Sequence, residues 1–128
     1  MKIKLKYKTF NGLFLGFLFL FFAVLLGAFG SHILEGRLSS KAMDTYRTGL
    51  YWHVVYSLVL CLLGALQISN LVKAPKIIRP ALILTFGTLF FSGNCYLYAF
   101  TGIKIFALLV PFGGMAFLIG TLWLAFIF

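Results

Sequence analysis

Six polar side chains interrupt the apolar stretches of this sequence, and they are its candidates for chemistry: His32, His53, Tyr56, Ser92, Asn94 and Tyr96. Imidazole can exchange protons or bind a metal near neutral pH, and hydroxyl and amide groups can position a ligand by hydrogen bonding. Such groups are costly inside a membrane, which makes each one a functional candidate. The alternative is structural, because Ser and Asn bond across helices and Tyr anchors helix ends at interfaces. Both interpretations remain open for the two histidines.

Three kinds of reaction chemistry can be weighed against these residues. His32 and His53 could form an axial pair for haem or a metal, but no Asp, Glu or Cys lies at a comparable depth to complete the ligand set. Hydrolysis would need a motif such as H-E-x-x-H, a serine elbow or a buried carboxylate, and none is present. The Gly113-Gly114 pair lacks the lysine of a phosphate loop. The sequence therefore predicts no enzyme, no cofactor and no metal.

Four uncharged stretches must position these side chains: residues 9–31, 48–72, 80–103 and 105–128. Each is long enough as a helix to cross a hydrocarbon core of about 30 Å. Hydrophobic residues make up 62% of the 128-residue chain and charged residues only 10%, which excludes a soluble domain. The predicted fold class is all-α, an integral membrane antiparallel four-helix bundle in one domain, with spans at about 10–32, 48–71, 79–101 and 105–127.

The net charge of +9 lies outside these stretches. Seven Lys and Arg residues flank one side, namely Lys2, Lys4, Lys6, Lys8, Lys73, Lys76 and Arg79, against four on the other, Arg37, Lys41, Arg47 and Lys104. The excess predicts both termini in the cytoplasm and attraction to anionic lipid headgroups rather than to nucleic acid.

The N-terminal region also imitates a secretory signal, because a Lys-rich start precedes an apolar run over 13–29 and the small residues Ala28 and Gly30. A run of that length exceeds the usual signal core of about 7–15 residues, so we expect the segment to remain as a span.

Small residues indicate how the spans pack. Ser57, Cys61 and Gly64 form one stripe, and a second stripe consists of Thr88, Ser92, Cys95 and Ala99. We expect the two stripes to face each other, or else the first or fourth span; the two cysteines read as packing residues. Ser39-Ser40 predicts the N-cap of a short interfacial helix that runs into the second span, and Pro80 predicts a helix start. Gly36, Gly102 and Gly113-Gly114 are the expected flexible points.

Four segments carry a resemblance to a known family. They are Leu26-Gly27-Ala28-Phe29-Gly30-Ser31-His32, Thr48-Gly49-Leu50, the run from Leu89 to Tyr96, and the run from Pro111 to Gly120. In order and spacing they resemble the motifs of the YgdD/YwdK-like family of small four-helix bacterial inner-membrane proteins. The second span departs from that pattern, since Tyr56 stands where the family has His and His53 where it has Gln. The resemblance implies a fold and a location in the bacterial cytoplasmic (inner) membrane.

The polar residues are predicted to converge in the outer half of the membrane, next to a helix-packing motif formed by Gly27, Gly30, Gly49, Gly93, Pro111, Gly113 and Gly114. The leading hypothesis is a non-enzymatic binding or accessory role for membrane lipid or a partner membrane protein. It predicts that His32→Ala and Asn94→Ala weaken helix packing. The alternatives are transport or permeation of a small solute by a homo-oligomer and a cofactor protein ligated by His32 and His53.

Overall fold

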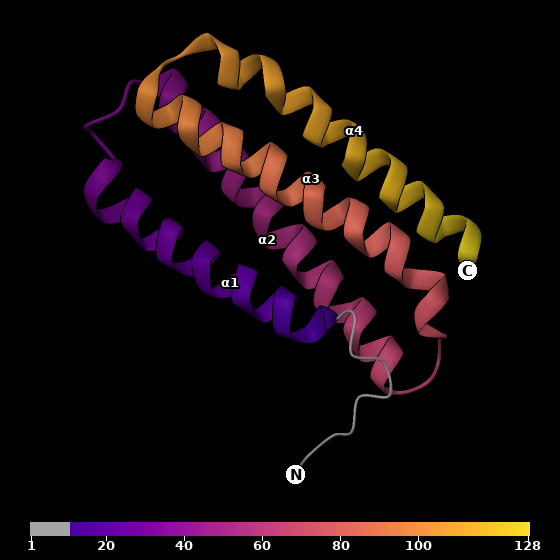
Figure 1. The fold of residues 1–128 in the computed structure, drawn as a ribbon. Coiled ribbons are helices and arrows are strands. Elements are labelled where there is room, and N and C mark those ends of the chain that lie inside the picture. Colours follow the sequence, from indigo (N-terminus) through magenta and orange to yellow (C-terminus); the bar gives the residue numbers. More distant parts are fainter. Residues whose placement is uncertain (1–10) are drawn as a thin grey trace.

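The computed structural model describes residues 11–128 and is all-helical, as predicted. Helix α1 spans Gly12–Phe29 and continues as a π-helical segment, η1, over Gly30–Leu34; α2 spans Ser40–Ile68, α3 spans Ala74–Thr101 and α4 spans Lys104–Ile127 (Figure 1). Four helical segments of this part of the chain are long and apolar enough to cross a membrane. Successive helices run antiparallel, which confirms the predicted fold class (Figure 1). The predicted N-terminal Lys cluster lies outside the described residues.

Two side-chain caps begin the first two helices. Asn11 accepts a hydrogen bond from the backbone N–H of Phe14 at 3.0 Å, and Ser39 accepts one from Ala42 at 3.2 Å. Each cap satisfies a backbone donor that has no partner inside the helix. The predicted cap at Ser39-Ser40 is therefore confirmed, and the expected interfacial segment and the second span form one continuous helix of 29 residues.

Helix α3 begins earlier than predicted. Its first residue is Ala74, Pro75 lies in its first turn, and Pro80 is inside the helix rather than at its start. Pro75 accounts for this difference, because proline suits the first turn, where no intrahelical N–H bond is made. Pro80 leaves unpaired only the carbonyl of Lys76, and Lys76 is exposed near the helix end, so the helix continues through Pro80 at low cost.

Each helix packs against its neighbour in sequence. The extensive interfaces among the described residues are α1 with α2, α2 with α3, and α3 with α4. Helices α2 and α3 are therefore central, and α1 and α4 flank them (Figure 1). Apolar side chains fill the core, chiefly Leu60, Leu63, Ile77, Leu84 and Phe117.

Glycines set the close approach of α1 to α2. A Cβ added at Gly16 would lie 2.5 Å from Cys61 Sγ and 2.9 Å from the Ser57 carbonyl oxygen. A Cβ added at Gly64 would lie 3.1 Å from Gly12 Cα. The stripe of Ser57, Cys61 and Gly64 therefore packs on the first span, which settles one of the alternatives that the sequence left open.

The second stripe meets α2 through a different glycine. A Cβ at Gly49 would lie 2.6 Å from Cys95 Cβ and 3.4 Å from the Ser92 carbonyl oxygen. Helices α3 and α4 approach as closely, since a Cβ at Gly113 would lie 2.5 Å from the backbone nitrogen of Phe91. The two predicted stripes thus face different helices and not each other.

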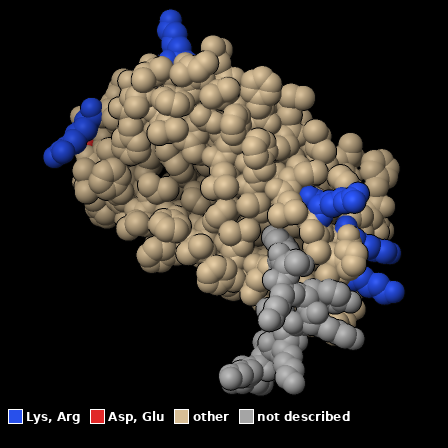
Figure 2. Space-filling model, in the orientation of Figure 1, with Lys and Arg blue, Asp and Glu red and all other residues tan. Residues whose placement is uncertain are grey.

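The charged residues gather at the two ends of the molecule, with an uncharged surface between them (Figure 2). We call these the loop 35–39 end, which also holds the turn between α3 and α4, and the loop 69–73 end, which also holds the C-terminus (Figure 1). Lys73, Lys76 and Arg79 belong to the loop 69–73 end. This separation matches a body whose middle lies in hydrocarbon.

Candidate functional site

His53 and Tyr96 are brought together as the sequence predicted. Nδ1 of His53 lies 2.9 Å from the Tyr96 hydroxyl, which links α2 to α3. The ring of Phe19 on α1 meets the imidazole edge-on, with centroids 6.0 Å apart. His53 is 7% exposed, and the Ser57 hydroxyl donates to its carbonyl oxygen at 2.5 Å. Three helices therefore enclose this histidine.

Ser92 makes a second polar link between the same helices. Its hydroxyl donates to the carbonyl oxygen of Gly49 at 2.6 Å, and the side chain is fully buried. Since Gly49 has no side chain, α3 comes close enough for this bond to form. The packing role predicted for Gly49 and the polar role predicted for Ser92 thus describe one contact.

Tyr46 is a site residue that was not selected from the sequence. It is 1% exposed, and its hydroxyl donates to the carbonyl oxygen of Leu26. Its ring covers Gly30, where a Cβ would lie 2.5 Å from Tyr46 Cε1. The available signal was its position, because Tyr46 shares a helical face with Met43 and Leu50 and so had to bury its hydroxyl.

Tyr46 also explains why Gly30 occurs in the segment from Leu26 to His32 that resembles the family motif. Gly30 begins the π-helical segment η1, and its N–H points at the carbonyl oxygens of both Gly27 and Leu26. A π-helical turn displaces the regular bonding pattern, and the tyrosine hydroxyl supplies an extra donor there. The tyrosine ring requires a glycine at position 30.

Tyr56, Asn94 and His32 do not join this cluster. Tyr56 turns to α4, where its hydroxyl lies 3.0 Å from Thr121 Oγ1 and its ring stacks on Phe117 with centroids 3.9 Å apart. Asn94 donates from Nδ2 to the Phe90 carbonyl of its own helix at 2.5 Å. His32 is exposed on η1. The prediction of a single cluster is therefore wrong for these three residues, because helical rotation sends them to different faces.

The positions of His32 and Asn94 also bear on the effect expected of replacing each residue by alanine. Asn94 bonds only within α3 among the described residues, and His32 is exposed. Exposure of His32 leaves no structural basis for a packing defect in His32→Ala, whereas Asn94 is buried and makes its hydrogen bond within α3.

The predicted packing residues differ in how closely a neighbouring helix approaches them. Gly30, Gly49 and Gly113 lie against a neighbouring helix. Gly27 and Gly114 have ordinary contact distances of 3.5 and 3.8 Å, no atom lies within 4 Å of a Cβ at Gly93, and Pro111 is exposed. The packing prediction does not hold for Gly93. Gly113-Gly114 is also no flexible point, because α4 is helical through it, whereas Gly36 and Gly102 do adopt positive φ angles of 83° and 70°.

A groove with a volume of about 570 Å³ lies at the loop 35–39 end. It is on the α4 side of the α2–α3 pair, away from α1. Its polar lining consists of Lys41, Asp44, Thr45, Thr48 and Tyr98. Its apolar lining consists of Phe91, Cys95, Ala107 and Val110. Three helices, α2, α3 and α4, therefore contribute to it.

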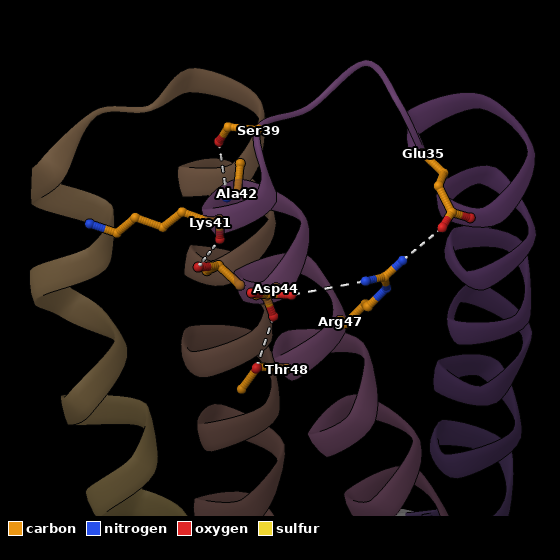
Figure 3. Close-up of polar contacts among 8 residues, drawn as sticks. Glu35, Ser39, Lys41, Ala42, Asp44, Arg47 and Thr48 are labelled. Atoms are coloured by element: carbon orange, nitrogen blue, oxygen red, sulfur yellow. Dashed lines mark hydrogen bonds and ion pairs between the residues drawn. The ribbon is translucent and has the colours of Figure 1, made fainter.

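Asp44 lines this groove, whereas Glu35 lies on the α1 side of Arg47 (Figure 3). Arg47 Nη2 lies 3.0 Å from Glu35 Oε1, and Arg47 Nη1 lies 3.9 Å from Asp44 Oδ1 (Figure 3). Lys41 points away from Arg47, toward the side of α3 and α4 (Figure 3). The mouth therefore presents a cation, Lys41, and a carboxylate, Asp44, whose contact with Arg47 is long.

Polarity falls along the groove. Lys41 is in the first turn of α2, and Thr48 lies about 10 Å further along the helix axis. Phe91 lines the groove from α3 nearly three turns before that helix ends, and Val110 lines it from α4 fewer than two turns after Lys104. The arrangement suits a molecule with a polar head and an apolar tail, because each part would meet a surface of its own kind.

Comparison with known proteins places the chain in a family. The family model described as "Protein of unknown function (DUF423)" matches residues 26–114. This chain belongs to the DUF423 family. The match begins at Leu26, whose carbonyl accepts the Tyr46 hydroxyl, and ends at Gly114, next to the α3–α4 contact. The His53–Tyr96 pair and the whole groove lie within the matched region.

Individual members of the DUF423 family agree with this assignment. The chain is 36% identical to a UPF0382 membrane protein of Staphylococcus epidermidis over 86% of both chains. It is 34% identical to YwdK of Bacillus subtilis over 76% of this chain and 78% of YwdK, and 33% identical to the inner membrane protein YgdD of Escherichia coli over 82% and 76%. No solved structure matches. The resemblance to YgdD and YwdK is confirmed, and the chain is a multi-pass inner-membrane protein with four candidate spans.

The departure from the family pattern in the second span has a structural reading. His53 bonds to Tyr96 on α3, and Tyr56 bonds to Thr121 on α4. The two residues therefore have separate interhelical partners in this chain.

Proposed function

We propose that this DUF423 protein is a non-enzymatic binding protein that holds a zwitterionic phospholipid in the groove between α2, α3 and α4. The observation that carries the proposal is that one cation, Lys41, and one carboxylate, Asp44, both line a groove whose deeper wall is apolar. The buried links around His53 and Tyr46 serve a different purpose, since their hydrogen bonds are made within the protein and stiffen the helices that form the groove.

The headgroup class follows from the charges. A headgroup such as phosphoethanolamine carries a phosphate and an ammonium, which match Lys41 and Asp44 respectively. The hydroxyls of Thr45 and Tyr98 can add hydrogen bonds to the phosphate. An acyl chain would lie against Phe91 and the facing residues of α4.

We also propose that both termini face the cytoplasm, so that the groove opens toward the outer leaflet. The excess of Lys and Arg at the loop 69–73 end and the N-terminus supports this orientation.

Cysteine labelling tests the orientation without altering any Lys or Arg. In a background with Cys61 and Cys95 replaced by Ala, we expect Ser40→Cys to react with a membrane-impermeant maleimide in intact cells. Leu71→Cys should react only after permeabilisation. The reverse pattern would overturn the orientation and place the groove in the inner leaflet.

Native mass spectrometry of the full chain in mild detergent tests the lipid site. We expect phosphatidylethanolamine to be retained by the wild-type protein and lost from Lys41→Gln and from Ala107→Trp, which adds a large ring to the wall that α4 contributes to the groove. Two controls make matched changes outside the groove: Arg37→Gln removes another exposed cation, and Leu108→Trp adds the same ring beside position 107.

Retention of phosphatidylethanolamine by Ala107→Trp at the wild-type level would contradict the proposal. Equal loss from Ala107→Trp and Leu108→Trp would also contradict it, because the effect would then not depend on the groove. Circular dichroism checks that each variant keeps its helical content.

A further inference from the structure

A second hollow lies at the loop 69–73 end, between the start of α3 and the last turns of α4. Its volume is about 620 Å³, and Lys76, Arg79, Trp123, Phe126 and Ile127 line it together with Pro75. It shares no residue with the groove at the other end. Its ligand is therefore a separate question.

No acidic side chain among the described residues lies at this hollow to pair with its cations. The chain contains two acidic residues in all, and both, Glu35 and Asp44, contact Arg47 at the opposite end. Lys76 and Arg79 are three residues apart on a helix, so their side chains project from the same face, and both are exposed. Figure 2 shows Lys and Arg side chains gathered at this end with no acidic side chain among them. The local positive charge calls for an anion from outside the chain.

The backbone at the start of α3 adds to the positive potential at this hollow. Helix α3 has 28 residues, and no side chain caps its first turn, since Lys73 at the cap position makes no such bond. The dipole of a long helix favours an anion at its start. Two residues of this first turn line the hollow, Pro75, which has no N–H, and Lys76, whose N–H donates to the Lys73 carbonyl oxygen at 3.0 Å, so the start of α3 contributes through its dipole.

The other wall is apolar and aromatic. Trp123 is 38% exposed and Phe126 is 83% exposed, although both are large hydrophobic side chains. Tryptophan is enriched where a membrane meets water, because its ring is apolar and its N–H is polar. An inorganic anion gains nothing from contact with an apolar wall. The acyl chain of a phospholipid, in contrast, would pack against it.

We propose that this hollow binds an anionic phospholipid, with the headgroup phosphate held by Lys76, Arg79 and the start of α3, and with the acyl chain against Trp123 and Phe126. Basic pockets between spanning helices are known to hold headgroups of this type. The site differs from the groove of the proposed function in position and in lipid charge, and it does not depend on that function or on the orientation of the termini.

The test uses the full-length protein in mild detergent and native mass spectrometry with added phosphatidylglycerol. The double variant Lys76→Gln/Arg79→Gln should lower the apparent affinity for phosphatidylglycerol about 25-fold, at about fivefold for each cation. The control Arg37→Gln/Lys104→Gln removes the same charge from the opposite end and should change that affinity less than twofold. Trp123→Ala should weaken phosphatidylglycerol binding through the apolar wall.

Two outcomes would overturn the proposal. Equal losses in the two double variants would show general attraction to net charge instead of a site. Binding of inorganic phosphate alone that is abolished by Lys76→Gln/Arg79→Gln, with no effect of Trp123→Ala on phosphatidylglycerol, would identify a phosphate site that takes no lipid. Retention of phosphatidylethanolamine is measured in the same variants, and its loss from Ala107→Trp but not from Lys76→Gln/Arg79→Gln separates the fates of the two sites.

Discussion

Replacing Gly113 by alanine should drive α3 and α4 apart. The added Cβ would lie 2.5 Å from the backbone nitrogen of Phe91 and 2.7 Å from its Cα, which is closer than real Cβ atoms come to other atoms. Those atoms belong to the main chain of α3, so no change of rotamer can relieve the overlap. Excess volume in a packed interface costs about 1–3 kcal/mol. Alanine recovers about 0.5–1 kcal/mol of that because it restricts the unfolded chain.

The net destabilisation expected for Gly113→Ala is about 1.2 kcal/mol, which is roughly eightfold in the equilibrium between folded and unfolded protein. Gly93→Ala is the matched control, because it makes the same chemical change in a helix where nothing lies within 4 Å of the new atom. We expect the control to be neutral or stabilising by up to about 1 kcal/mol.

Reversible unfolding in mixed micelles with a rising fraction of sodium dodecyl sulfate measures both variants. Circular dichroism and the fluorescence of Trp52 and Trp123 report the transition. Gly113→Ala should unfold at a lower dodecyl sulfate fraction than the wild type, and Gly93→Ala at the same or a higher one. If both variants unfold at the same fraction, the reasoning from close helix approach is refuted.

The same assay checks three smaller effects. Tyr46→Phe keeps the ring over Gly30 and removes only the hydrogen bond to the Leu26 carbonyl, which still faces a backbone N–H. The free energy of unfolding should therefore fall by about 0.5–1.5 kcal/mol. An unchanged free energy of unfolding would show that the bond contributes nothing. Arg47→Gln should cost less than about 1 kcal/mol, because its ion pairs are exposed to solvent, and a larger loss would indicate that they tie loop 35–39 to α2. His32→Ala should leave the unfolding transition unchanged, since the side chain is exposed, whereas a destabilised variant would restore the packing role expected from the sequence.

Local chemistry made the helices and one of their caps predictable. Long uncharged stretches must form helices in a membrane, because each backbone group has to bond within its own segment. Ser39 was predictable as a cap for a similar reason, since it lies next to the groups that it bonds. Pro80 was misread because a second proline, Pro75, lies five residues earlier, and either one could have opened the helix.

The partners of the polar side chains were less predictable. The sequence placed His53, Tyr96 and Tyr56 in one group of six polar residues, and in the structure His53 bonds to Tyr96 whereas Tyr56 turns to α4. Depth in the membrane can be counted along the chain at 1.5 Å per residue, so residues at one level were identified. The direction of each side chain around its helix relative to the neighbouring helices could not be counted in that way.

Sequence alone determined the fold class, the family, the four spans and the residues that have to be accommodated inside them, because these depend on hydrophobicity, length and local motifs. Only the tertiary structure decided which helix each small-residue stripe meets, that Tyr46 lies over Gly30, and that charged and apolar residues of three helices line one groove. The physical reason is that a helical pattern defines a face but not the neighbour of that face. The neighbour is chosen by how closely two backbones can approach, and that depends on atoms far apart in the chain.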